Sequence, residues 1–343
     1  MIGAFAVRDG VLGPVPDPDP AALPADALWI DLLNPTAEEE AAAERLLGVG
    51  IPTREDMAAI EESARLHEER GALVMTAVVV TGVSEGRRPA AAEVKFVLTP
   101  RTLATVRYAD PLPFRAFAAK SRRDPDAHGA SELVFLSLVE GIVDRLADIL
   151  EATDAGLDAL SEEVFEGGGA AAQGAPGPDG ARRSGRARGR PPRTDLQAVL
   201  KRLGRANALA GKLRESLLSI GRMLAFFRQG MGEKLRNGAK ARLRTLDRDV
   251  ASLAEYDTQL SAGIGFLLEA TFGLIGLEQN GIIKVFSVAA VLFLPPTLVG
   301  TVYGMNFDHM PELHWAFGYP FALGLMALSA VAPYCWFKRR GWL

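Results

Sequence analysis

Along residues 1–125, hydrophobic positions occur in short runs that are bounded by turn-forming or charged residues. Short runs rich in Val, Ile and Leu are typical of β-strands. We therefore expect residues 1–125 to form a cytoplasmic α/β domain with helices packed on a small mixed sheet. The pattern predicts four strands, at residues 28–33, 72–82, 93–99 and 102–108.

Two helix starts lie within the same region. Asn34 and Pro35 are typical of a helix N-cap and first turn, and Gly48 is typical of a helix end. Thr53 and Asp56 have the spacing of a capping box, which predicts the start of a second helix.

From Ser131 onward the hydrophobic spacing becomes helical, and residues 126–232 are expected to form a helical hairpin in the cytoplasm. Acidic residues recur at three- or four-residue steps between 131 and 166, on one helix face. In residues 194–249, by contrast, most of the charged side chains are Lys or Arg. Two explanations stay open. The charges belong to complementary surfaces of a hairpin or an oligomer, or the acidic surface raises the local concentration of divalent cations.

Residues 167–193 separate the two halves of this hairpin and are rich in Gly, Pro, Ala and Arg. Such a segment cannot bury enough apolar surface to fold, so we expect a disordered loop. After a break at 229–234, helical spacing continues without a proline as far as Pro295. One helix over 233–303 would be about 105 Å long at ~1.5 Å per residue, so residues 233–281 are expected to form a stalk that reaches the membrane.

Two segments are apolar enough to cross a bilayer, residues 282–303 and 316–337. Each spans roughly 33 Å as a helix. The tail 338–343 begins with Lys-Arg-Arg and the loop 304–315 has no Lys or Arg, which places the tail inside and the loop outside. The N-terminus lacks the pattern of a signal peptide. We expect a multi-pass protein of the cell inner membrane, with both termini cytoplasmic and membrane lipids as partners.

Composition limits the remaining function classes. The formal net charge of −4 argues against a general nucleic-acid binder, and the single Cys335 excludes a disulfide framework. The sequence has no nucleophile elbow, phosphate-binding loop or HExxH motif. We therefore expect neither an enzyme nor a protein with an organic cofactor.

A stripe of small and hydroxylated residues follows the end of the stalk into the first span. Its members alternate steps of three and four residues, the spacing of a coiled-coil seam. The stripe either packs against other helices in lipid or lines a water-filled pathway, in which Leu294 and Ile283 form apolar constrictions. A pathway requires an oligomer, because two helices cannot enclose a pore, and Pro295-Pro296 should kink the helix near its narrow level. This polar stripe consists of Asn280, Ile283, Ser287, Ala290, Leu294, Thr297, Thr301 and Gly304.

The polar stripe leads to a compact turn, Gly304-Met305-Asn306, at the outer end of the first span. Gly304 can supply the left-handed conformation that ends a helix. Around a symmetry axis, Asn306 side chains would form a ring of neutral amide oxygens. Mg²⁺ gives up its water reluctantly, and such a ring can hold a hydrated ion without trapping it. Asp308 and Glu312 would then attract cations to this outer mouth.

The segment Tyr-Gly-Met-Asn-Phe-Asp-His-Met-Pro-Glu-Leu, at residues 303–313, resembles the signature of the CorA magnesium-transporter family. The resemblance extends back through residues 278–306 and reaches Trp-Ile-Asp-Leu-Leu-Asn-Pro-Thr at residues 29–36. It implies a homopentamer with a funnel-shaped cytoplasmic α/β domain, a long pore-lining stalk helix and a second membrane helix outside it. Mg²⁺ would be both the substrate and a regulatory ligand.

The resemblance also assigns residues. It implies that Asn306, with Gly304 and Met305, forms the selectivity filter, and it places four members of the polar stripe along the pore. Some relatives have Gly where Thr301 stands, so the pore here is expected to be more polar or narrower at that level. The family also has carboxylates between subunits that bind Mg²⁺ and hold the pore closed, for which Asp249 and Glu85 are the nearest matches.

Two alternatives to a magnesium channel remain. The first is transport of zinc, cobalt or nickel within the same superfamily. The intact Met-Pro-Glu-Leu segment favours magnesium, and His309 and His314 alone give little preference for softer metals. The second is a scaffold or enzyme anchored by a helical hairpin, which does not need to oligomerise.

Overall fold

The computed structural model describes residues 1–8, 10–51, 65–83, 88–120, 129–172, 195–305, 315 and 317–340, without the side chains of 118–120 and 166–172. These residues divide into two compact units, Met1–Leu268 and Glu269–Leu343. Helix α7 contributes its first part to one unit and its second part to the other.

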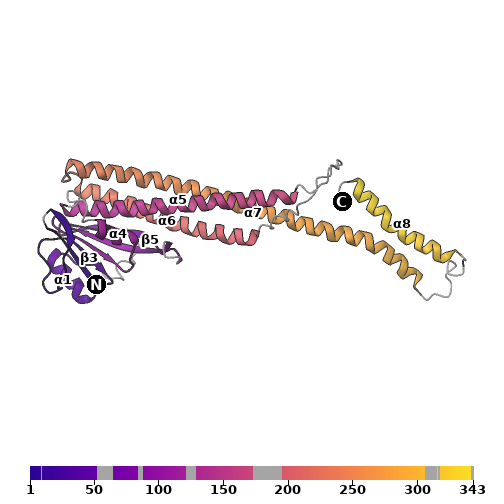
Figure 1. Ribbon diagram of the computed structural model, residues 1–343, viewed down its shortest axis with the longest axis horizontal. Coiled ribbons are helices and arrows are strands. Elements are labelled where there is room, and N and C mark those ends of the chain that lie inside the picture. The colour runs from indigo at the N-terminus through magenta and orange to yellow at the C-terminus, as the bar shows by residue number, and fades with distance from the viewer. Residues whose placement is uncertain are drawn as a thin grey trace, which may run out of the picture. The chain divides into compact units, whose positions relative to one another are not determined.

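The first unit contains a β-sheet (Figure 1). Its seven strands have the order β2-β1-β3-β7-β6-β5-β4. Neighbouring strands are antiparallel except β3 and β7, which pair in parallel, so the sheet is mixed as expected. The four strands predicted from hydrophobic runs correspond to β3, β5, β6 and β7. The strand bounds are β1 Ile2–Arg8, β2 Val11–Pro14, β3 Ala27–Leu33, β4 Leu66–Glu69, β5 Ala72–Thr81, β6 Ala90–Leu98 and β7 Leu103–Arg107.

Helix α1, Ala37–Leu47, begins two residues later than the sequence pattern indicated. Its N-cap is Thr36, whose hydroxyl accepts from the backbone N–H of Glu39 while the Glu39 carboxylate accepts from the N–H of Thr36. Asn34 is not the cap, because its φ of 45° places it in a turn before the helix. Gly48 does end α1, with a φ of 70° that glycine adopts without strain. The predicted start at Thr53 lies outside the described residues.

Side chains alternate between the two faces of the sheet, so each face has its own core. On one face, Ile30, Val74 and Val97 pack in a cluster with Ala43 of α1. On the other face, aromatic rings connect the sheet to the helices: Phe96 of β6 meets Phe135 of α5, Ser131–Ala172, edge to face at 5.5 Å. The Phe135 ring lies 4.7 Å from that of Phe227 in α6, Leu196–Met231.

Helix α6 also satisfies the free edge of β5. Strand β4 pairs only with the first part of β5, up to Met75, so within the described part of the chain the later residues of β5 have no strand partner on that side. Ser216 donates its hydroxyl hydrogen to the carbonyl oxygen of Val78 at 2.6 Å, and the N–H of Val78 donates to the Ser219 hydroxyl at 2.9 Å. Two serines one turn apart therefore take the place of a strand and fix α6 against the sheet.

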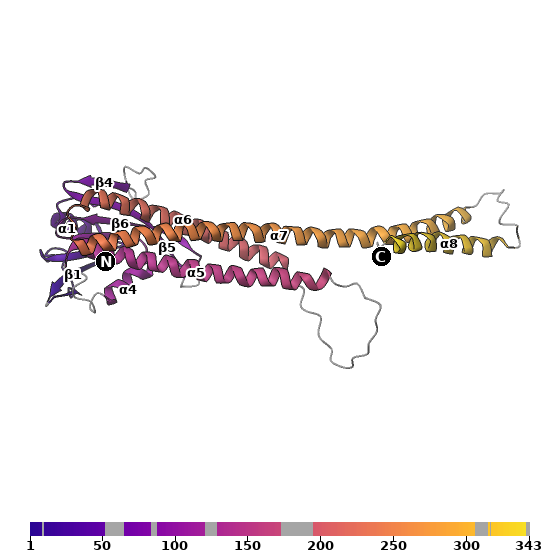
Figure 2. The same ribbon diagram turned by 90° about the horizontal axis from the view of Figure 1, so that it is seen from above.

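Three long helices, α5, α6 and the first part of α7, Asn237–Tyr303, lie side by side in the first unit (Figures 1 and 2). Oppositely charged side chains connect them. Arg242 of α7 forms a bidentate pair with Glu140 of α5, at 2.8 and 2.5 Å. Arg202 of α6 reaches Glu163 of α5 at 2.6 Å. Part of the charge pattern thus serves contacts between helices of one chain.

The helix ends differ in detail from the sequence pattern. Helix α5 continues to Ala172, so the first residues of the expected loop 167–193 are helical. Residues 173–194 lie outside the described part. Helix α7 begins at Asn237 rather than at 233, after a short connection from Met231.

Candidate functional site

The second unit consists of the later part of α7 and helix α8, Gly318–Arg339. Among the described residues, α7 and α8 are long and apolar enough to cross a membrane. Little of the most apolar stretch of each helix is buried within the chain. Lys338 and Arg339 lie in the last turn of α8, and the Arg340 guanidinium stacks on the Trp336 ring at 4.8 Å. Basic side chains beside an aromatic ring are typical of a helix end at the membrane surface.

Every residue of the polar stripe is exposed in the single chain. The two apolar members predicted to form constrictions are among the most exposed, Ile283 at 61% and Leu294 at 69%. The rest are small or polar. Faces of this kind are typical of contacts between membrane helices or of water-filled pathways.

Helix α8 contacts a different face of α7. Val288 is buried, and a Cβ built on Gly300 would lie 3.1 Å from the Cε of Met326. The glycine therefore leaves room for the Met326 side chain of α8 against α7. The sequence pattern did not identify Gly300 as a site residue. The feature that could have identified it is its position, four residues before Gly304 and next to the stripe. Helix α8 thus leaves the stripe itself uncovered.

The threonine hydroxyls of the stripe have a defined orientation. Thr297 Oγ1 donates to the carbonyl oxygen of Phe293 at 2.7 Å, and Thr301 Oγ1 donates to that of Thr297 at 2.8 Å. Each hydroxyl hydrogen is thus used within the helix, and the oxygen lone pairs remain as acceptors on an exposed face. Helix α7 continues through Pro295 and Pro296, whose missing N–H groups leave two carbonyls of the preceding turn without an intrahelical donor.

The end of α7 corrects the prediction for Gly304. This residue does not have a positive φ, unlike Gly48, so it does not end the helix in the left-handed conformation. Its N–H instead donates to the carbonyl oxygens of Gly300 at 3.0 Å and Thr301 at 3.2 Å, and that of Met305 donates to Val302 at 3.3 Å. The last turn tightens in the manner of a 3₁₀ turn.

Several predicted site residues cannot be placed. Asn306, Asp308, Glu312 and Glu85 lie outside the described residues. Asp249 is exposed on α7. Within the described part of the chain, no group of three or more His, Cys, Asp or Glu side chains is arranged to hold a metal ion. The proposed pairing of Asp249 with Glu85 therefore remains a prediction.

Solved structures with the same fold include the complete CorA magnesium transporter from Methanocaldococcus jannaschii, with a TM-score of 0.73. It has 15% sequence identity, and the match covers 100% of this chain and 99% of that one. The full-length CmaX protein matches with a TM-score of 0.65 and 16% identity, over 99% of this chain and 97% of that chain. At these identities the likeness shows the fold alone.

Sequence relatives are closer. The chain is 35% identical to the magnesium transport protein CorA of Pasteurella multocida (strain Pm70) over the full length of both. It is 33% identical to that of Salmonella typhimurium, over 93% of this chain and 92% of the relative. The sequence model of the family described as CorA-like Mg²⁺ transporter protein matches residues 24–171 and 193–339. The chain therefore belongs to the CorA-like Mg²⁺ transporter family.

Proposed function

We propose that this protein is a gated Mg²⁺ channel of the cell inner membrane, formed by a homopentamer in which the polar stripe of each α7 faces a common axis. The observation that carries the proposal is the uncovered stripe on α7, combined with the contact of Met326 of α8 near Gly300, on a different face of α7. Family membership supports Mg²⁺ as the substrate and disfavours a membrane-anchored enzyme or scaffold.

An oligomer follows from the chemistry of the stripe. One chain supplies two membrane helices and cannot enclose a pore. Copies arranged around an axis give the stripe an aqueous lumen, while the large exposed side chains beside the stripe, such as Phe286 and Phe293, meet lipid or a neighbouring subunit. Both termini are cytoplasmic in this arrangement, in agreement with the basic end of α8.

The orientation of the threonines suits a hydrated cation. Water bound to Mg²⁺ presents its hydrogens outward, so the pore must offer acceptors. Because Thr297 and Thr301 donate their own hydrogens to the helix, their oxygens accept from those waters. Asn306, with Gly304 and Met305, would form the selectivity ring at the outer mouth, and Asp308 and Glu312 would raise the local cation concentration there.

The apolar side chains of the stripe would close the pore. Side chains of Leu294 and Ile283 from several subunits would form constrictions that exclude water when packed together. Regulatory Mg²⁺ at carboxylates between subunits, with Asp249 and Glu85 as candidates, would relieve charge repulsion and favour the packed state. Loss of that Mg²⁺ would shift the population toward a hydrated pore.

Mg²⁺ flux into liposomes that contain purified protein tests this function. The wild type should show uptake, and Asn306→Ala should lose it while remaining an assembled oligomer. Asn207→Ala is the matched control, since Asn207 is an exposed asparagine on cytoplasmic α6. Equal uptake by Asn306→Ala and the control would refute the selectivity ring, and absence of uptake by the folded wild type would refute the transport function.

A further inference from the structure

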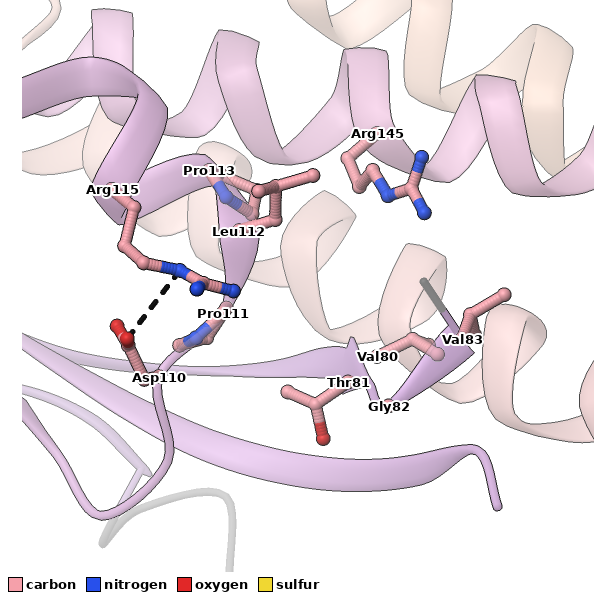
Figure 3. Close-up of a pocket in the computed structure, with 10 residues that line it drawn as sticks. All are labelled: Val80, Thr81, Gly82, Val83, Asp110, Pro111, Leu112, Pro113, Arg115 and Arg145. Carbon is pink, nitrogen blue, oxygen red and sulfur yellow. Dashed lines mark ion pairs between the residues drawn. The ribbon is translucent and has the colours of Figure 1, made fainter. Parts of the chain in front are cut away.

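A small pocket lies in the first unit, beside the end of β5 (Figure 3). Residues 80–83 and the loop 110–113 form its walls, and Arg115 of α4, Leu112–Lys120, and Arg145 of α5 line it. Its volume of about 30 Å³ is enough for about two water molecules. The pocket is therefore too small for a larger ligand. A surface that fits one lies on α8, in the second unit.

One side of α8 carries a row of exposed residues, which we call the α8 lane. Leu325 is 37% exposed, Leu328 63% and Trp336 50%, and Ala332 between them is also exposed. Steps of three and four residues place all four on one side of the helix. Met326, which contacts α7, lies on a different side. The lane is therefore a surface of α8 that α7 leaves open.

The α8 lane has the length of one lipid in one leaflet. Leu325 and Trp336 are 11 positions apart, which is about 16 Å along a helix at ~1.5 Å per residue. The hydrocarbon core of a bilayer is roughly 30 Å thick, so this part of the lane spans about one leaflet. Trp336 would then lie at the level of the headgroups, where tryptophan is enriched in membrane proteins.

Two guanidinium groups lie at the headgroup end of the α8 lane. The Cζ atom of Arg340 is 4.8 Å from the centre of the Trp336 ring. The backbone N–H of Arg340 donates to the carbonyl oxygen of Trp336 at 3.1 Å, so the helical path continues to this residue. Arg339 is exposed and follows Trp336 by three positions, on the same side. A guanidinium that lies over a ring keeps its N–H edges for an anion.

The inner end of α8 has no side-chain carboxylate that could balance these arginines. The sequence has no Asp or Glu after Glu312, and none between Glu278 and Asp308. Within the described part of the chain, neither Arg339 nor Arg340 forms an ion pair. The counter-charge therefore comes from outside this part of the protein, and at the surface of a membrane the abundant anions are lipid headgroups.

We propose that the α8 lane binds an anionic phospholipid, with an acyl chain along Leu325 and Leu328 and the phosphate between Arg339 and Arg340. Guanidinium groups form charge-assisted hydrogen bonds with phosphate oxygens. A zwitterionic headgroup carries its own ammonium group, which weakens the attraction, so the site prefers a lipid of net negative charge. The site rests on the membrane position of α8, which is part of the proposed function, but not on the pore.

Quenching of tryptophan fluorescence by brominated lipids measures this preference in bilayers. The full-length protein is reconstituted into vesicles of phosphatidylcholine and phosphatidylglycerol, in which one of the two lipids carries bromine near the top of its acyl chains. The signal of Trp336 is the difference between the protein and its Trp336→Phe variant. Each basic residue at a membrane surface contributes about fivefold to the binding of anionic lipid, so phosphatidylglycerol should be preferred at Trp336 by about tenfold or more.

Three variants separate a site on one side of α8 from the general charge of its end. Arg339→Gln and Arg340→Gln should each reduce the preference for phosphatidylglycerol about fivefold. Lys338→Gln removes the same charge from the opposite side of the helix and should reduce it by less than about twofold. Asn306→Ala, which should lose Mg²⁺ uptake, should keep the full preference, so the site is tested independently of transport.

Equal quenching by the two lipids in the wild type would overturn the proposal, as expected if a carboxylate of a neighbouring subunit neutralises the arginines. An equal loss in all three charge variants would also overturn it, because a basic helix end without a defined site attracts anionic lipid in that way. Displacement of the brominated lipid by inorganic phosphate at constant ionic strength would show that a free anion, and not a lipid, occupies the arginines.

Discussion

The hydroxyl of Thr301 donates a hydrogen bond to the carbonyl oxygen of Thr297, 2.8 Å away and one turn earlier in α7. The bond consumes the only hydroxyl hydrogen of Thr301, so the oxygen faces the uncovered side of the helix as an acceptor. The two threonines therefore present a ladder of acceptors along the polar stripe.

Thr301→Val removes one of these acceptors and keeps the shape of the side chain. We expect Mg²⁺ uptake by proteoliposomes to fall about fivefold, the effect of roughly one hydrogen bond to a hydrated ion. Ser329→Ala is the matched control, because the Ser329 hydroxyl bonds its own helix at Met326 on α8, away from the stripe. Unchanged Mg²⁺ uptake by Thr301→Val would show that the Thr301 hydroxyl does not contact the ion on its pathway.

Gly300→Val should disturb the contact between α7 and α8. A Cβ at this position already lies 3.1 Å from Met326 Cε, so a branched side chain should lower the free energy of unfolding by about 1–3 kcal/mol. Met326→Ala should partly restore the loss in the double variant, and Gly281→Ala, with open space around its Cβ, should not show it. Thermal unfolding of the detergent-solubilised protein measures all three.

Tyr256 provides a spectroscopic test of the contact between α7 and α5. Its hydroxyl donates to Asp154 Oδ2 at 2.5 Å, and this hydrogen bond, together with burial and nearby carboxylates, raises the pKa of Tyr256 to about 12 from an ordinary 10.0. The folded state therefore keeps a proton that the unfolded state loses. The stabilising contribution is complete below pH 10 and disappears as the pH rises to about 12.

Asp154→Asn should lower the pKa of Tyr256 toward its ordinary value. Ultraviolet absorbance of tyrosinate against pH measures the change, with the spectrum of Tyr256→Phe subtracted to isolate this residue. A titration of Tyr256 that is the same with and without the Asp154 carboxylate would contradict the contact.

Asp257 should also make the free energy of unfolding depend on pH, for a different reason. Its side chain is fully buried, Oδ2 pairs with Arg214 at 2.9 Å, and Oδ1 has no hydrogen-bond partner within the described part of the chain. Burial raises the pKa of Asp257 despite the opposing effect of Arg214. Arg214→Gln should leave the carboxylate unpaired and lower the free energy of unfolding by about 2 kcal/mol, less than for a wholly buried pair because Arg214 is half exposed.

The raised pKa of Asp257 determines how the free energy of unfolding changes with pH. A raised pKa means that the folded state binds the proton more readily than the unfolded state, so stability increases as the pH falls through the folded-state value. The deficit of Arg214→Gln should therefore shrink in acid and be largest at neutral pH. Chemical unfolding at several pH values checks this, with Arg248→Gln as the control. A deficit that grows in acid would show that Arg214 does not act through the ionised carboxylate of Asp257.

Sequence alone predicted the parts of this fold that have strong local patterns. The valine run of β5, the Gly48 helix end and the two apolar spans are examples, because each depends on neighbouring residues. It did not predict β1, β2 or β4, since β1 contains Gly and Ala, β2 is a four-residue strand that ends in Gly and Pro, and β4 is a polar edge strand whose pairing with β5 supplies its order. The capping-box residues Thr36 and Glu39 are present in the sequence, but the pattern was interpreted with Asn34 as the N-cap.

The site was predictable in its spacing but not in its chemistry. Steps of three and four residues placed Thr297 and Thr301 on one face, yet the donation of both hydroxyls to the helix depends on side-chain geometry. The role of Gly300 depends on α8, which is distant in sequence. The prediction for Gly304 was wrong because a tightened last turn satisfies the same backbone groups as a left-handed cap would.

The most direct test of the account is whether the polar stripe faces a water-filled axis shared by several copies. In a Cys335→Ala background, Mg²⁺ flux into proteoliposomes is measured before and after a water-soluble thiol reagent, for Thr297→Cys on the stripe and Val285→Cys, an exposed position on the opposite side of the helix. We predict that the reagent blocks flux through Thr297→Cys, that oxidation cross-links its subunits, and that Val285→Cys is insensitive to both. Equal sensitivity of the two variants, or an unaffected Thr297→Cys channel, would contradict the account.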